Sequence, residues 1–188
     1  MTQEQIITRL KEGNARYMAD QNERGLQDLD RRAALTAGQD PWAIILSCAD
    51  SRVVPELAFD TGLGELFVVR VAGNIANSSS IASIEYAVAN IGSPVIVVLG
   101  HESCGAVTAA FAGGDNGYNL NHLLSHINPA LHAAEEGASV NDIVKVNAAK
   151  NAEELVNRSA IIRNAVDSGA LKIVPAYYNL ASGKVDFL

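Results

Sequence analysis

Two short segments of the chain carry the residue types that bind a transition metal. Residues 48–52 read CADSR and residues 101–104 read HESC. Together they supply two thiols, an imidazole, a carboxylate and a guanidinium. A borderline cation such as zinc binds thiolate sulfur and imidazole nitrogen, and three protein ligands leave a fourth tetrahedral position for water or substrate. The two segments therefore indicate a catalytic zinc site.

The only two cysteines of the sequence, Cys48 and Cys104, both lie in these segments. A disulfide, or the burial of two small thiols in a core, is the alternative that the cysteines alone leave open. A cytosolic pair is more often metal-bound or catalytic than bridged. The His-x-x-Cys spacing places His101 and Cys104 on one face of a helical turn or tight bend, which favours the metal.

Asp50 and Arg52 allow more than one role beside such a metal. Asp50 is either a fourth zinc ligand that closes the site, or a carboxylate held away by a charge-assisted pair with Arg52. A purely structural ion pair in a loop is the simpler interpretation. In a bidentate pair the carboxylate keeps acceptor capacity that can orient a zinc-bound hydroxide. The pair thus either switches the site off or steers its nucleophile.

Length and composition suit one compact domain. The 188 residues are 48% hydrophobic, which allows a sizeable core. The net charge of -7 argues against a general nucleic-acid surface, because phosphate binding needs clustered cations. The sequence opens with no signal-peptide pattern, and no apolar run approaches the roughly 18 to 20 residues of a membrane span. We expect a cytoplasmic protein that binds neither nucleic acid nor membrane.

The hydrophobic pattern predicts an α/β domain. Continuous apolar runs at 42–47, 66–70 and 94–99 are typical of parallel strands covered on both faces. The run at 171–177 and residues 184–188 predict an antiparallel hairpin at the sheet edge. Helical segments are expected at about 78–91, 104–112, 120–135 and 142–168. Alternating strands and helices imply a central, mostly parallel sheet flanked by helices.

The first 40 residues are predicted to form a helical arm, and residues 41–188 the α/β zinc-binding core of a single domain. Residues 2–19 have amphipathic helical spacing, and a polar stretch with a short helix near 31–36 follows. Such a helix has little to bury against in a chain of this size, so we expect the arm to exchange across a two-fold dimer.

The chemical residues are predicted to leave the sheet at one edge. Residues 48–52 follow the first run, Arg70 ends the second, and His101 follows the third. Ligand sites in open α/β sheets gather beyond the carboxyl ends of the strands. Cys104 would then open a helix whose N–H groups and positive dipole end face whatever sits on the metal.

These segments resemble, in order and spacing, the β-class carbonic anhydrases. The resemblance covers nearly the whole chain and is densest from 41 to 111. It rests on CADSRV at 48–53, FDTGLGELFVVRVAGN at 59–74, SIEYAV at 83–88, VVLGHESCGAV at 97–107 and the closing YYNLASGKVDFL. It implies a zinc lyase that reversibly hydrates carbon dioxide to bicarbonate and a proton, by attack of zinc-bound hydroxide.

The resemblance also implies a role for each site residue, in a homodimer or in a homotetramer built from dimers. From the residues alone, Gln39 is an ordinary loop residue and Phe67 a core residue. The resemblance implies one zinc ion per subunit held by Cys48, His101 and Cys104, with the Asp50–Arg52 pair beside it and Asp50 as a fourth ligand in a closed state. It also implies that Gln39 hydrogen-bonds the substrate across the dimer interface and that the N–H of Gly105 contacts a substrate oxygen. The carbon dioxide pocket would be lined by Phe67, Ala72 and Tyr86.

Two positions depart from the family pattern. Ile45 stands where members regulated by bicarbonate carry Trp, which argues against such a regulatory site, and Gln39 favours the open, water-bearing form. Pro175 stands where Gly is common and predicts an edge strand or a bend, because proline lacks a backbone donor.

Other functions and sites remain as alternatives. One alternative is the hydrolysis of carbonyl sulfide or carbon disulfide, which related zinc sites catalyse. Another is a binding protein with a vestigial zinc site rather than an enzyme, but the intact Asp50 and Arg52 argue against it. His122 and His126 have the spacing of a second metal site, but a solvated helix face explains them better. Because two thiolates cancel the charge of zinc, we expect hydration to rise on the alkaline side of neutrality.

Overall fold

Five strands form the centre of the computed structural model, which describes residues 1–23 and 25–188. Their order across the sheet is β2-β1-β3-β4-β5. The first three neighbouring pairs are parallel and the β4–β5 pair is antiparallel. This confirms the predicted sheet and its C-terminal hairpin. The strands are β1 (Ala43–Ser47), β2 (Leu66–Arg70), β3 (Val95–His101), β4 (Lys172–Tyr178) and β5 (Val185–Phe187).

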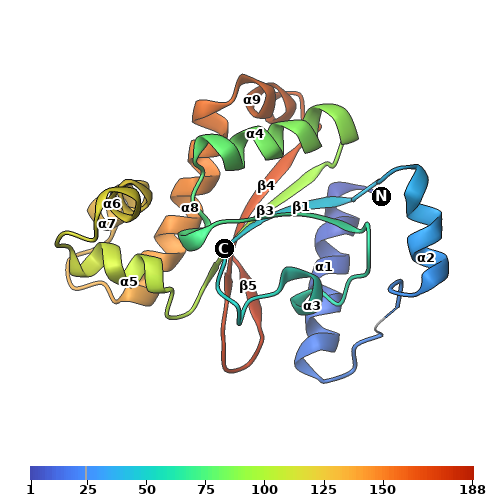
Figure 1. Cartoon of the computed structure of the whole chain (residues 1–188), viewed down its shortest axis with the longest axis horizontal. Coiled ribbons are helices and arrows are strands. Elements are labelled where there is room, and N and C mark those ends of the chain that lie inside the picture. Colours follow the sequence, from blue (N-terminus) through green and yellow to red (C-terminus); the bar gives the residue numbers. More distant parts are fainter. Residues whose placement is uncertain (24) are drawn as a thin grey trace.

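Helices cover both faces of the sheet (Figure 1). One face carries α1 (Gln3–Met18) and the short α3 (Pro55–Ala58). The other carries α4 (Ser78–Tyr86), which continues as a π-helical turn over Ala87–Ile91, together with α8 (Val140–Arg158) and α9 (Ala160–Asp167). A third group, α5 (Gly105–Ala112), α6 (Tyr118–Ser125) and α7 (Asn128–Ala133), follows the end of β3.

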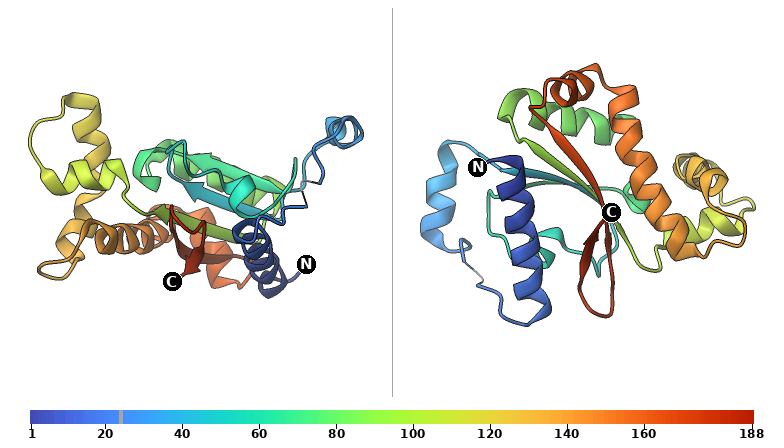
Figure 2. Two further views of the ribbon diagram at one scale, coloured as in Figure 1. Left: turned by 90° about the horizontal axis from the view of Figure 1, so that it is seen from below. Right: turned by 180° about the vertical axis from the view of Figure 1, so that it is seen from behind.

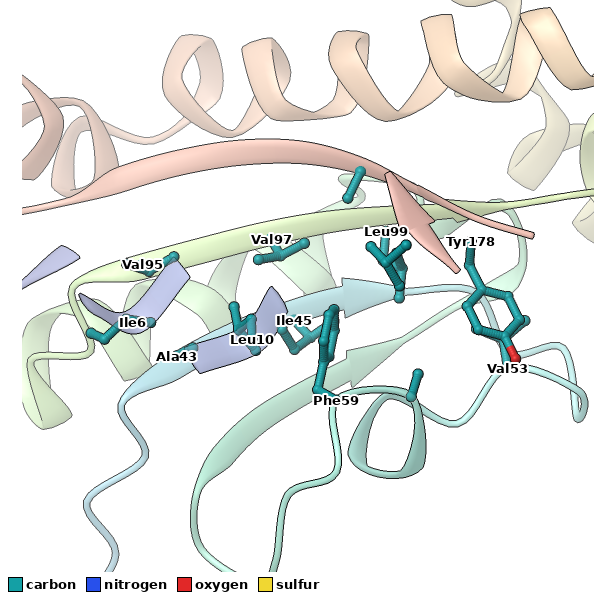
Figure 3. Close-up of a cluster of buried hydrophobic side chains, with 13 residues drawn as sticks. Ile6, Leu10, Ala43, Ile45, Val53, Phe59, Val95, Val97, Leu99 and Tyr178 are labelled. Carbon is teal, nitrogen blue, oxygen red and sulfur yellow. The ribbon is translucent and has the colours of Figure 1, made fainter. Parts of the chain in front are cut away.

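Successive side chains of the inner strands enter opposite cores. Ile45 and Val97 pack with α1 and α3 in one cluster (Figure 3), whereas Ile44 and Val98 pack beneath α4 and α8 in the other. Because side chains alternate along a strand, covering both faces buries every residue of β1 and β3. The predicted two-sided burial of these strands is confirmed.

Helix α1 packs on the sheet of its own chain. Ile6 and Leu10 are fully buried in the cluster that also contains Phe59 (Figure 3). A capping box starts the helix, with Thr2 and Gln5 each bonding the backbone of the other. The expectation that this helix has little to bury against is therefore wrong: the sheet face beside α3 is left open by the other helices and accepts it.

The stretch around α2, residues 25–37, lies away from the sheet. Figure 2 shows α2 (Leu29–Ala34) displaced from the sheet and from α1. None of the six residues of α2 is buried, and Leu29 is 72% exposed. Hydrogen bonds join this segment to the loop at Leu63, which donates to Leu26 O and accepts from Arg31 Nε. The free part of the expected arm is thus confined to the stretch around α2.

Two of the predicted helices are each a pair of helices. The segment predicted at 120–135 divides into α6 and α7, where Pro129 occupies the first turn of α7. The segment predicted at 142–168 divides at Ser159, whose backbone is extended with φ -124° and ψ 117° and whose Oγ accepts from Ile162 N to cap α9. The predictions were wrong because the apolar periodicity continues across both breaks.

Pro175 lies where β4 has a neighbour on one side only. β5 pairs with residues 176–178 of β4, so residues 172–175 face β3 on one side and no described strand on the other. The Pro175 carbonyl accepts from Leu188 N at 2.9 Å, but the missing N–H interrupts no ladder. The predicted edge strand is therefore wrong for β4 as a whole, which lies between β3 and β5, but Pro175 lies outside the part of β4 that pairs with β5, where the missing N–H is tolerated.

Within the part of the chain that the structure describes, no helix combines the length and apolar content needed to cross a lipid bilayer.

The packing of α1 depends on a close approach at Gly13. A Cβ atom there would lie 1.9 Å from the carbonyl oxygen of Phe59. Gly13→Ala should therefore lower the free energy of unfolding by about 2 kcal/mol, because overpacking against backbone outweighs the gain of about 1 kcal/mol in helix propensity. Urea unfolding measures this, and Gly25→Ala, where a Cβ meets no atom within 4 Å, is the control. A stabilised Gly13→Ala protein would contradict this packing.

Candidate metal centre

Cys48, His101 and Cys104 meet at the carboxyl edge of the sheet. Their ligand atoms all lie within 4.8 Å of one another, and all three residues are buried. Cys48 follows β1, His101 ends β3, and Cys104 is the N-cap of α5. Because β1 and β3 are parallel neighbours, their carboxyl ends lie side by side. The predicted meeting of the two segments is confirmed.

The imidazole of His101 is oriented for a metal. Its Nδ1 lies 2.8 Å from the carbonyl oxygen of Glu102, which fixes the proton on Nδ1. Its Nε2 is buried and finds no hydrogen-bond partner among the described residues. An unpartnered buried polar atom costs about 1–3 kcal/mol. A metal ion bound to Nε2 would remove that cost, so the orphaned nitrogen fits a cation site.

The two thiols are close but not bridged. Their sulfur atoms are 4.0 Å apart, and both cysteines are free. The hydrogen bond between them lowers the pKa of Cys48 and raises the pKa of Cys104, so the pair shares one proton. Both can ionise only when a cation lies between them, because two negative charges repel strongly at this distance in a buried site. Two sulfurs and one imidazole nitrogen are a donor set that zinc prefers.

Backbone contacts fix Cys48 in place. The Arg70 side chain donates from Nε to Cys48 O at 2.9 Å and from Nη2 to Asp50 O at 2.6 Å. The Gly73 N–H donates to Cys48 Sγ at 3.4 Å. From the sequence, Arg70 is placed at this edge without a role, and no role is assigned to Gly73. These two functional residues were missed, because a contact to backbone or from backbone leaves no pattern in residue types.

Asp50 and Arg52 form a bidentate pair beside the cluster. Arg52 donates from Nε to Oδ1 at 2.9 Å and from Nη2 to Oδ2 at 2.8 Å, and its own N–H donates to Oδ1 at 2.9 Å. These bonds hold the pKa of Asp50 well below its usual range. Asp50 Oδ2 is 3.8 Å from His101 Nε2. An ionised carboxylate is therefore held at the rim of the metal site by Arg52.

Two further predicted residues lie near the cluster. Ala72 directly precedes Gly73, whose N–H reaches Cys48. Gly105 is the first residue of α5, directly after Cys104, and a Cβ there would meet no atom within 4 Å. The approach to the start of α5 is therefore open.

The other three predicted residues lie away from the cluster of their own chain. Gln39 is exposed and precedes β1, so about 16 Å of strand separates it from Cys48. Phe67 is half-buried and pairs with Ile44 toward the amino end of the sheet. Tyr86 is 52% exposed at the end of α4, about 12 Å along the helix from Ser78. No single subunit brings them to its own cysteines.

Comparison with known proteins shows that the chain is similar to carbonic anhydrases over most of its length. The family model described as "Carbonic anhydrase" matches residues 43–185. The "Carbonic anhydrase 2" of Mycobacterium tuberculosis is 41% identical over 181 residues, which are 93% of this chain and 87% of that protein. The carbonic anhydrase of Mycolicibacterium smegmatis is 38% identical over 183 residues, which are 94% and 89% of the two chains.

The fold also matches solved structures. A tetrameric beta-carbonic anhydrase of the ascomycete Sordaria macrospora superimposes with a TM-score of 0.76 at 25% identity, covering 99% of this chain and 98% of that one. The beta-carbonic anhydrase CcaA gives the same TM-score and identity, covering 98% and 92%.

Removal of the metal should destabilise the fold. The three ligands are far apart in the unfolded chain, so zinc binds the folded state and contributes about 4 kcal/mol at a thousandfold excess over its Kd. We expect a lower Tm by calorimetry after chelation, restored by zinc. Cys48→Ser, which lacks one ligand, should respond much less. A wild-type Tm that is independent of verified zinc content would contradict this.

Proposed function

The chain belongs to the β-class of the carbonic anhydrase family and catalyses the reversible hydration of carbon dioxide to bicarbonate and a proton, and we propose which of its residues perform the reaction. The observation that carries the function is the buried cluster of Cys48, His101 and Cys104, the zinc site of this enzyme. These three residues would hold the zinc ion, which would supply a Lewis acid that lowers the pKa of a water molecule and so provides a nucleophile near neutral pH.

Asp50 orients the attacking water rather than deprotonating it. A carboxylate whose pKa is held so low by Arg52 is a poor base but a constant hydrogen-bond acceptor. Asp50 Oδ2 lies on the His101 side of the carboxylate and can accept the water's hydrogen bond there. Arg52 fixes this geometry through its two parallel bonds. Closure of the site by Asp50 as a fourth ligand would compete with these bonds for the lone pairs of the carboxylate.

Ala72 and Gly105 complete the near side of the substrate site. Ala72 offers an apolar methyl group beside the Gly73 N–H that contacts Cys48. The Gly105 N–H is one of the unpaired donors of the first turn of α5, so it meets a substrate oxygen as negative charge develops there.

Gln39, Phe67 and Tyr86 serve the site of a second subunit. Each lies toward the amino end of the sheet in its own chain, and Gln39 and Tyr86 are exposed. A two-fold dimer exchanges such surfaces reciprocally, so each site gains the three residues from its partner. In this homodimer Gln39 hydrogen-bonds the substrate, while Phe67 and Tyr86 cover the carbon dioxide pocket. The tetrameric Sordaria relative supports a further pairing of dimers.

Two reduced zinc-binding cysteines suit a reducing compartment, so the cytoplasm is the proposed location. The proposed single domain comprises residues 1–188: α1 packs on the α/β core over 41–188, and the segment around α2 is the arm.

Stopped-flow measurement of carbon dioxide hydration by the zinc-loaded protein tests the role of Asp50. Asp50→Asn should lower kcat by about 10- to 100-fold with unchanged zinc content, because an uncharged amide with one acceptor oxygen cannot keep both bonds to Arg52 and orient the water as the carboxylate does. Asp186→Asn is a matched control: Asp186 also pairs with a cation two residues away, Lys184 at 2.6 Å, but it lies on β5. A zinc-loaded wild-type protein without hydratase activity, or equal losses in both variants, would contradict the proposal.

Subunit mixing tests the shared site. Gln39→Ala and Asp50→Asn each damage both sites of a homodimer, but a heterodimer of the two chains keeps one site with both residues intact. Random reassociation of equal amounts should restore about a quarter of wild-type hydratase activity. Activity that stays at the mean of the two parents after mixing, with exchange verified by mass spectrometry, would place Gln39 outside the partner's site.

A further inference from the structure

We propose that Asn147, Asn151 and Arg158, a polar stripe along α8, are positioning residues for the zinc ligand Cys48. They act through residues 71–76, the Gly73 loop, whose backbone they hold. The inference rests on the proposed function in one respect only, that Cys48 binds the metal.

The stripe forms three hydrogen bonds with the backbone of the loop. Asn147 Nδ2 donates to Gly73 O at 2.8 Å, Asn151 Oδ1 accepts from Ala76 N at 2.7 Å, and Arg158 Nη1 donates to Ala76 O at 2.6 Å. The residue numbers rise by four and then by seven, so the three side chains lie on one face of the helix.

The two asparagines are locked to each other as well as to the loop. Asn151 Nδ2 donates to Asn147 Oδ1 at 3.0 Å and to Asn147 O at 2.8 Å. Asn147 is 0% and Asn151 3% exposed. Burying an amide is costly unless its polar atoms are bonded, and here both amides are oriented by bonds at each end. These hydrogen bonds therefore fix the position of the loop backbone.

That position is one the loop would not adopt without support. Gly73 and Asn74 are consecutive residues with positive φ, 74° and 45°. Asparagine in this region costs of order 1 kcal/mol, and such conformations persist only where their surroundings hold them. The loop is also confined at Gly73 itself, since a Cβ there would lie 3.0 Å from Ile127 Cδ1 and 3.3 Å from Ala106 Cβ.

The result of this confinement is the hydrogen bond to the metal ligand. The Gly73 carbonyl is held by Asn147 while its N–H donates to Cys48 Sγ at 3.4 Å. An N–H donor withdraws charge from a thiolate and fixes its direction, which is how groups behind a ligand tune the metal. The stripe therefore acts on the zinc from the far side of the loop without touching it.

Cobalt(II) substitution reads this effect directly, because thiolate-to-cobalt charge-transfer absorption depends on the charge of the sulfur. In Asn147→Ala and Asn151→Ala the band should move to longer wavelength, and zinc affinity measured with a competing chelator should fall about tenfold. Asn14→Ala is the matched control. Asn14 is also a buried asparagine that bonds three backbone groups, Ala58 O, Gly183 O and Val185 N, but these belong to the α1 side of the fold.

A band and a zinc affinity unchanged in both stripe variants would overturn the proposal, as would equal changes in Asn14→Ala. If the buried variants fail to fold, Arg158→Ala replaces them, because Arg158 is exposed at the end of α8. The band should then shift in the same direction, and an unchanged band would reject the stripe's role. These readouts need bound metal but no turnover. Failure of this proposal would leave the band unchanged in the variants. Failure of the proposed function would instead appear as a protein that binds zinc without hydratase activity, or as one that binds no metal.

Discussion

Two buried thiols 4.0 Å apart determine the chemistry of the site. Without a cation they share one proton, and with a cation both ionise and leave the metal with little net charge. The other groups of the site act on the net charge at the metal. In the proposed site the imidazole would add a neutral third ligand, the Gly73 N–H would withdraw charge from one sulfur, and the pair with Arg52 would keep Asp50 from adding a further negative ligand.

The fold supplies this arrangement by bringing distant segments to one edge. Parallel pairing of β1 with β3 aligns the ends that carry Cys48 and His101, and a single turn later Cys104 starts α5. Arg70 from the neighbouring strand ties down the backbone of the first segment. The site is thus built on rigid strand ends, which position ligands more tightly than a mobile loop would.

Sequence reasoning predicts the parts of this protein that depend on residue type and period. Continuous apolar runs located the strands, and the chemistry of CADSR and HESC located the metal site. It does not predict contacts made by backbone, so the Gly73 donor and the Arg70 tie were missed. Nor does it see where periodicity runs through a break, as at Ser159, or that an amphipathic α1 finds a vacant sheet face in its own chain.

The measurement that tests the account most directly is a crystal structure of the zinc-loaded protein at alkaline pH, with the metal located by anomalous scattering at the zinc edge. We expect one peak bonded to Cys48, His101 and Cys104, with Zn–S distances of about 2.3 Å and Asp50 still paired with Arg52. A peak elsewhere, or an Asp50 oxygen in the fourth position at alkaline pH, would contradict it.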